Sequence, residues 1–167
     1  MTQPKIPPEI YYQNLPKRYL ASAVMIFNEK DELLVVKPSY KEDWLLPGGI
    51  TDQDETALQT AIREIKEEIG LTLNIKAMRC VDMKPGGGGL SASVQSIFET
   101  EPLSSVQIAN IQLDNNEIIE FAFLPVNEAV KILIAPLAQR TRQALLARQL
   151  NTCFYLENGQ NPFGKAV

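Results

Sequence analysis

The segment from Glu55 to Ile69 repeats apolar residues with the period of an α-helix, and it constrains the fold more than any other feature of the chain. Its apolar positions follow i, i+3 and i+4 spacing: Ala57, Leu58, Ala61, Ile62, Ile65 and Ile69. Gly70 follows directly, as expected for a residue that closes a helix in the left-handed conformation. The sequence therefore predicts an amphipathic helix, whose start is capped by either Asp52 or Asp54.

Apolar and β-branched runs on both sides of this helix indicate strands. The expected strands cover Tyr19–Phe27, Glu32–Lys37, Ile75–Met83, Leu90–Thr100 and Ile118–Leu124. Asn127 is expected to cap a short helix through Leu133, and Pro136 to lie in the first turn of a last helix that ends near Leu150. Strands, a helix, more strands and then helices indicate one α/β layered domain with a mixed sheet.

The proline-rich residues 1–17 predict an extended N-terminal arm before a domain over residues 18–150. The tail, residues 151–167, contains the apolar run Phe154–Leu156, which docks either on the domain or on a partner subunit, so a homodimer stays open. Gly86–Gly89 is expected to form a mobile hairpin tip. A phosphate-cradle interpretation is weaker, because the run lacks the continuation of a P-loop.

Composition removes several classes of function. The net charge of −4 argues against a nucleic-acid partner, and no run approaches the ~18 apolar residues of a membrane span. Cys80 and Cys153 are expected to be reduced thiols in the cytoplasm. The chain has no histidine, which excludes Ser-His-Asp and Cys-His triads and His-ligated zinc.

Three carboxylates of the expected helix, those of Glu64, Glu67 and Glu68, lie at i, i+3 and i+4 and so share one face. Like charges at this spacing repel by a few tenths of a kcal/mol per pair, so folding alone gives no reason to cluster them. Mg²⁺ takes carboxylate oxygens and completes its coordination with water and substrate phosphate oxygens. The cluster therefore predicts a metal site that acts on a phosphate compound.

The stretch from Gly49 to Leu71 resembles the signature of the Nudix hydrolases and fills all nine of its specified positions. The resemblance implies an α/β/α sandwich with a mixed sheet and a dependence on Mg²⁺, for which Mn²⁺ substitutes. It implies that Glu64 and Glu68 bind the principal metal, and that Glu67 joins when further metals are present.

The same resemblance implies that Arg63 pairs with Glu55 to support the arrangement of loop and helix. Gly48 and Gly49 would let the loop backbone bend close to the metal and the substrate. The implied reaction is hydrolysis of a diphosphate linkage in a nucleoside di- or triphosphate derivative. A narrower alternative is an oxidised-nucleotide hydrolase, and another is a catalytically silent domain that senses a nucleotide.

Weaker candidates lie outside the signature. Glu117 is preferred over Glu120 and Asp114 as a further catalytic carboxylate, because loops reach into sites more freely. Lys37 is a candidate contact to substrate phosphate, or else a solvated lysine at a strand end. Trp44 either stacks on a base or, as the sequence favours, packs beneath the loop.

Overall fold

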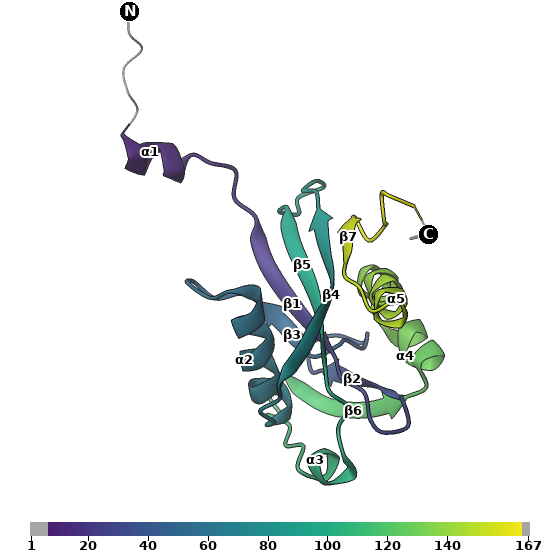
Figure 1. The fold of residues 1–167 in the computed structure, drawn as a ribbon. Helices are drawn as coiled ribbons and strands as arrows, with labels where there is room; N and C mark the ends of the chain where they lie inside the picture. The colour runs from purple at the N-terminus through teal and green to yellow at the C-terminus, as the bar shows by residue number, and fades with distance from the viewer. Residues whose placement is uncertain (1–6, 165–167) are drawn as a thin grey trace, which may run out of the picture.

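The computed structural model describes residues 7–164, in which helices cover both faces of a twisted sheet (Figure 1). The strands are β1 (Tyr19–Met25), β2 (Leu33–Pro38), β3 (Gly48–Ile50), β4 (Ile75–Lys84), β5 (Ser93–Thr100), β6 (Ile118–Leu124) and β7 (Phe154–Glu157). The helices are α1 (Pro8–Gln13), α2 (Ala57–Ile69), α3 (Ser105–Ala109), α4 (Val126–Ile132) and α5 (Ala135–Gln149).

The main sheet has the strand order β3-β1-β5-β4-β7 and mixes both kinds of pairing. β1 runs parallel to β5 and β4 parallel to β7, whereas β1 with β3 and β4 with β5 are antiparallel. β2 and β6 form a separate antiparallel pair. α2 packs on β1 and β3, while α5 packs on β4 from the other side, as Figure 1 shows. The expected α/β/α architecture with a mixed sheet is confirmed.

The apolar interior is divided between the two helical layers. The cluster beneath α4 and α5 includes Met25, Phe27 and Leu156, and the cluster beneath α2 includes Ile65 and Ile69. Each fully buried side chain of this size contributes roughly 1.5–3 kcal/mol to folding. The two clusters fix α2 and α5 on opposite sides of β1 and β5, and this separation decides which side chains reach each end of the site described below.

Helix α2 begins two residues later than expected, and neither Asp52 nor Asp54 caps it. The hydroxyl of Thr56 accepts a hydrogen bond from the Gln59 backbone N–H, and the Gln59 side chain accepts one from the Thr56 N–H. This reciprocal pair satisfies two orphan donors at once. Asp54 instead adopts a positive φ of 68° in the preceding turn. The expectation about Gly70 is confirmed, because its φ is 73°.

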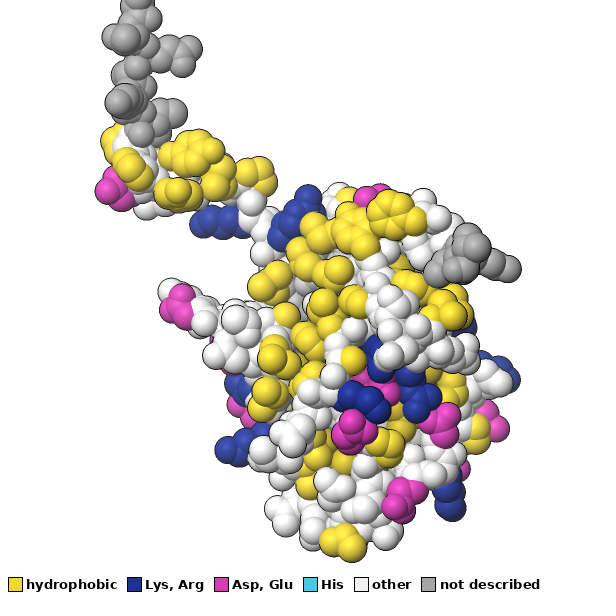
Figure 2. Space-filling view, in the orientation of Figure 1, with side chains coloured by type: hydrophobic (Ala, Val, Ile, Leu, Met, Phe, Trp, Pro, Cys, Tyr) yellow, Lys and Arg dark blue, Asp and Glu magenta, His cyan; other side chains and the backbone are white. Residues whose placement is uncertain are grey.

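The structure corrects the prediction for the N-terminal arm and decides between the two alternatives for the C-terminal tail. The arm is not extended throughout, since Pro8–Gln13 forms α1, while the start of the arm, residues 1–6, lies outside the described residues. Figure 2 shows apolar side chains gathered on this helix, where Tyr11 and Tyr12 are exposed. The tail run docks on its own domain, because it forms β7 beside β4.

Two helical details were also wrong or missing in the sequence interpretation. α4 begins at Val126 after Pro125, so Asn127 lies inside the helix and is not its cap. α3 was not expected; the hydroxyl of Ser104 caps it in the same reciprocal manner as in α2. No helix within residues 7–164 is long and apolar enough to cross a membrane.

The glycine run forms the tip of the β4–β5 hairpin, as expected. Gly87 and Leu90 exchange two backbone hydrogen bonds of 3.0 Å across a two-residue loop. Both loop residues, Gly88 and Gly89, have positive φ values of 59° and 85°. A type I′ turn, which suits a two-residue hairpin loop, requires a positive φ at both loop residues. This requirement explains glycine at both positions.

We predict that Thr56→Ala lowers the free energy of unfolding by about 1 kcal/mol, because it removes the acceptor of the α2 cap. Urea denaturation measures this loss. Asp54→Asn, which keeps a residue tolerant of positive φ, should change stability by less than about 0.5 kcal/mol. A larger effect of Asp54→Asn than of Thr56→Ala would show that Thr56 is not the residue that caps α2.

We also predict rapid amide exchange at Gly88 and Gly89. Nothing lies within 4 Å of a Cβ built at either position, so no packing opposes the backbone entropy of these residues. Hydrogen exchange followed by mass spectrometry tests this, with β5 as the protected internal reference. Protection at the hairpin tip equal to that in β5 would contradict the prediction.

Candidate active site

The acidic side chains of α2 meet the short strand β3. Glu64 and Glu68 are 8% and 4% exposed, although both are charged residue types. The backbone N–H of Gly48 donates a hydrogen bond of 2.9 Å to Oε2 of Glu68. One helical turn separates the two carboxylates, so they lie one above the other where the helix faces the loop. The fold thus buries two acids of the signature beside one backbone segment.

The two glycines of β3 allow this close approach. A Cβ on Gly49 would stand 2.2 Å from Oε1 of Glu64, which no real side chain tolerates. A Cβ on Gly48 would stand 2.1 Å from the carbonyl oxygen of Ser22 on β1, and Gly48 also has a φ of 145°. Gly48 is therefore required for packing against the β1 backbone, whereas a side chain at Gly49 would displace the Glu64 carboxylate from its place beside the loop.

Arg63 joins the loop to the helix. Its Nε and Nη2 donate to both oxygens of Glu55 at 2.8 and 3.0 Å, in the forked geometry that suits a guanidinium. Its Nη2 also donates to the carbonyl of Ile50, and its Nη1 reaches Glu64 and Glu67 at 2.8 and 2.9 Å. The hydrogen bonds from Arg63 lower the pKa of Glu55 to about 2. This carboxylate therefore stays ionised wherever the protein is folded near neutral pH.

Burial and mutual repulsion have the opposite effect on the two inner acids. Desolvation raises the pKa of Glu68 to about 9, and the charges of Glu64, Glu117 and Asp114 add to the rise. Desolvation also raises the pKa of Glu64, although the hydrogen bond from Arg63 opposes it. The site therefore has a deficit of positive charge where its carboxylates meet.

The residues fit a hard divalent cation in donor type and in access. Carboxylate oxygens are the ligands such ions prefer, and the missing side chain at Gly49 leaves room for the Glu64 carboxylate beside the loop. Within residues 7–164, no group of three or more His, Cys, Asp or Glu side chains is placed to hold a metal ion. Arg63 engages Glu64 and also Glu67, whose side chain is 59% exposed.

A further acid approaches from the start of β6. Glu117 raises the pKa of both Glu64 and Glu68 through its charge, whereas Glu120 does not figure among the groups that affect either. The Asp114 carboxylate accepts hydrogen bonds from the backbone N–H groups of Glu117 and Ile118, which fixes the turn that carries Glu117. The charge of Glu117 thus bears on both buried acids of α2.

Lys37 and Trp44, the two candidate substrate contacts, already have partners within the protein. Nζ of Lys37 donates to the Glu42 carboxylate at 3.0 Å and to the Glu42 carbonyl oxygen. Trp44 packs against the interior beneath α4 and α5, and its backbone exchanges hydrogen bonds with Ile132 and Ile134. The packing interpretation of Trp44 holds, and Lys37 is held by its own neighbouring loop.

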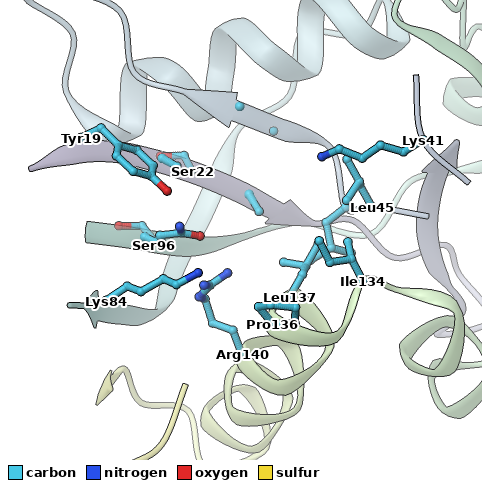
Figure 3. A pocket seen from close by; sticks show the side chains of 16 residues that line it. Tyr19, Ser22, Lys41, Leu45, Lys84, Ser96, Ile134, Pro136, Leu137 and Arg140 are labelled. Atoms are coloured by element: carbon cyan, nitrogen blue, oxygen red, sulfur yellow. The ribbon is translucent and has the colours of Figure 1, made fainter. Parts of the chain in front are cut away.

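A cavity of about 310 Å³ opens beside the loop and contains residues that the sequence did not single out (Figure 3). Gly48 and Gly49 line it together with three cationic side chains: Lys41, Lys84 and Arg140. Leu45, Ile134 and Leu137 supply an apolar wall. No local motif marks these positions, because they come from a loop, the end of β4 and the first turns of α5.

Comparison with known proteins shows the family. The NUDIX domain model matches residues 17–148, and the chain belongs to the Nudix domain family. A Bacillus subtilis (strain 168) protein, provisionally named an 8-oxo-dGTP diphosphatase, is 39% identical over 62 residues, which is 37% of this chain and 42% of that protein. The matched region thus spans about two fifths of that curated relative's length.

Solved structures share the fold over most of the chain. A MutT protein from Methanosarcina mazei Go1 has a TM-score of 0.65 at 21% identity, covering 83% of this chain and 99% of that one. The NUDIX domain of Shewanella oneidensis NrtR, solved with ADP ribose, has a TM-score of 0.65 at 20% identity, covering 88% and 100%. At these identities the likeness shows the fold alone.

We predict that Glu68→Gln stabilises the protein in excess chelator, and more so at pH 8 than at pH 5. The folded pKa of Glu68, about 9, lies above the ordinary glutamate value of 4.5, so the parent loses stability as pH rises between these values. Glutamine keeps an acceptor for the Gly48 N–H but does not ionise. The gain in free energy of unfolding should be larger at pH 8 by roughly 1–4 kcal/mol, the upper end being the full linkage between these two pKa values.

Urea denaturation at the two pH values measures this difference. Glu67→Gln is the matched control, because its exposed side chain makes only a surface ion pair with Arg63, worth about 0–1 kcal/mol. A clear loss of stability in Glu68→Gln at pH 8 would show instead that the ionised carboxylate is held by a structural partner.

Proposed function

We propose that this protein is a Mg²⁺-dependent pyrophosphohydrolase that cleaves a diphosphate linkage in a nucleoside di- or triphosphate derivative. One observation carries the proposal: the buried carboxylates of Glu64 and Glu68 face the side-chain-free loop Gly48–Gly49, which also lines a cavity with a cationic wall. Folding gains nothing from burying two acids side by side, whereas phosphate chemistry assisted by a divalent cation uses both features.

In this proposal Glu64 and Glu68 hold the principal cation, and Glu67 joins them when Arg63 releases it. A bound Mg²⁺ or Mn²⁺ would neutralise phosphate charge and supply a water nucleophile at neutral pH. Arg63 and Glu55 act as positioning residues, because their fork holds the loop against α2. Gly48 orients Glu68 through its N–H.

Glu117 is the candidate general base, since its charge already bears on both buried acids and the chain contains no histidine. Its loop position lets it approach a substrate without moving α2. The proposed compartment is the cytoplasm, a placement that suits the free thiol of Cys153, which is exposed. The proposed substrate is a small molecule, and we propose no nucleic-acid or membrane partner.

The test is a substrate panel with Mg²⁺ or Mn²⁺ and detection of released phosphate or nucleotide. The panel contains nucleoside triphosphates, oxidised nucleotides, ADP ribose, dinucleoside polyphosphates, nucleotide sugars and coenzyme A compounds. Turnover in at least one class, abolished by excess chelator, is expected. Tight binding of a nucleotide with no turnover of any class would favour the sensor alternative instead.

We predict that Glu68→Gln lowers turnover at least ~10²-fold on the best substrate, because it weakens a ligand of the catalytic metal. The Glu67→Gln, Glu68→Gln double variant should lose still more. Glu29→Gln is the matched control, an exposed acid in the turn before β2. Parent-like turnover in Glu68→Gln, with the control unchanged, would remove Glu68 from the proposed site.

A further inference from the structure

The cavity beside Gly48–Gly49 has a positively charged end that the proposed chemistry does not use. In Figure 3, Lys84 and Arg140 lie together at one end of the cavity, and Lys41 enters from the other. Lys84 and Arg140 also line a second, adjoining hollow of about 200 Å³. Within the described part of the chain, no acidic side chain lines the first cavity, although the whole chain carries a net charge of −4.

Arg140 is a buried guanidinium with unused donors. Its side chain is 5% exposed, and its Nε donates to Oδ2 of Asp82 at 3.0 Å. The other oxygen of Asp82 accepts the backbone N–H of Gly159 at 2.9 Å. Asp82 therefore fixes the orientation of Arg140 through one nitrogen. Among residues 7–164, neither Nη group of Arg140 has a hydrogen-bond partner, and both remain available to the cavity.

A purely structural ion pair does not explain this arrangement. A structural arginine would satisfy its Nη groups on neighbouring carbonyl oxygens, and a second cation would not be placed beside it. Lys84 is that second cation, and its Nζ makes no hydrogen bond within the described residues. The Asp82 carboxylate compensates one of these two positive charges, and an anion held between Arg140 and Lys84 would compensate the other.

The start of α5 adds to the positive field. Pro136 and Leu137 of its first turn line the cavity, and no side chain caps the helix. The first turn of this 15-residue helix contains no acidic residue, so its dipole is not compensated there. A buried guanidinium with two free Nη groups and a neighbouring lysine supply the donors and the charge that a phosphate group takes. The helix start adds its dipole only, because Pro136 has no N–H and the N–H groups of Leu137 and Ala138 donate to the Ile134 carbonyl oxygen.

We propose that this end of the cavity binds a second phosphate group of the substrate, separate from the diphosphate linkage that is cleaved. The inference rests on the proposed function, because Gly48 and Gly49 line the same cavity and place its near end at the acidic cluster. The apolar wall of Leu45, Ile134 and Leu137 then contacts the part of the molecule between its phosphates. The preferred substrate class is a nucleotide derivative with a remote phosphate monoester.

A binding experiment tests the subsite without turnover. Full-length protein labelled with ¹⁵N in excess chelator is titrated with inorganic phosphate at constant ionic strength, while the side-chain signals of Arg140 and the amide of Leu137 are followed. Saturable shifts of these signals are expected. Lys84→Gln should weaken phosphate binding roughly tenfold, the effect of losing one charge-assisted contact. Lys30→Gln, at an exposed turn, should leave it unchanged.

Arg140→Gln should weaken binding further, but it also leaves the buried Asp82 without its partner and is at risk of unfolding. Lys84 has no buried partner, so Lys84→Gln tests the subsite without that risk. Arg142→Gln, on the exposed side of α5, is the control for Arg140→Gln. Shifts that do not saturate, or equal affinity in the parent and Lys84→Gln, would overturn the proposal.

A second arm compares turnover on substrate pairs that differ by one remote phosphate monoester: coenzyme A with dephospho-coenzyme A, and NADPH with NADH. The phosphorylated member should have a kcat/KM at least roughly tenfold higher in one pair, and Lys84→Gln should reduce that ratio toward one. Phosphate binding without any turnover would defeat the proposed function but support the subsite. Turnover with no preference in either pair, and no phosphate binding, would defeat the subsite alone.

Discussion

The close contact between a backbone without side chains and a helix that carries buried acids is the constraint on which the rest of this structure depends. β3 pairs with β1 so closely that a Cβ on Gly48 would meet Ser22, and it faces α2 so closely that a Cβ on Gly49 would meet Glu64. The forked ion pair between Arg63 and Glu55 closes the turn between β3 and α2. A side chain at Gly48 would push β3 away from β1, and one at Gly49 would displace the Glu64 carboxylate.

Holding the acids in place has an electrostatic cost that the apolar face of α2 offsets. Ala61, Ile65 and Ile69 are fully buried, and two isoleucines alone contribute roughly 3–6 kcal/mol. Desolvation raises the pKa of Glu68 to about 9, so keeping it ionised in the folded apo protein works against that gain. The helix therefore uses packing on one face to hold an unfavourable charge arrangement on another, which a bound cation would relieve.

Local patterns predicted the elements whose signals lie within one segment. The bounds of β6 and the left-handed Gly70 at the end of α2 follow directly from a β-branched run and from one glycine. The residue that caps α2 could not be predicted from a local pattern, because several polar residues precede the helix. Only the folded turn shows that Thr56 faces the free N–H groups. α3, with five residues, is too short for its period to be visible in sequence.

Contacts between distant segments could not be predicted in this way. The tail run was apolar enough to dock somewhere, but only the register of β7 beside β4 decides that it docks on its own domain. The acidic helix could be placed from one 23-residue signature, whereas Lys84 and Arg140 lie far apart in sequence and meet only because β4 and α5 pack together.

This difference has a physical consequence for how such a chain acquires specificity. The glycine loop and the acids lie within one stretch, residues 48–68, so a change there bears on the proposed cation site and on the local packing together. The cationic end of the cavity joins the end of β4 to α5, which the ion pair of Asp82 with Arg140 links. In the proposed subsite, a substitution at Lys84 would alter which substrate is held without moving Glu64 or Glu68. On this proposal, local geometry fixes the reacting end of the site and leaves the recognising end free to change.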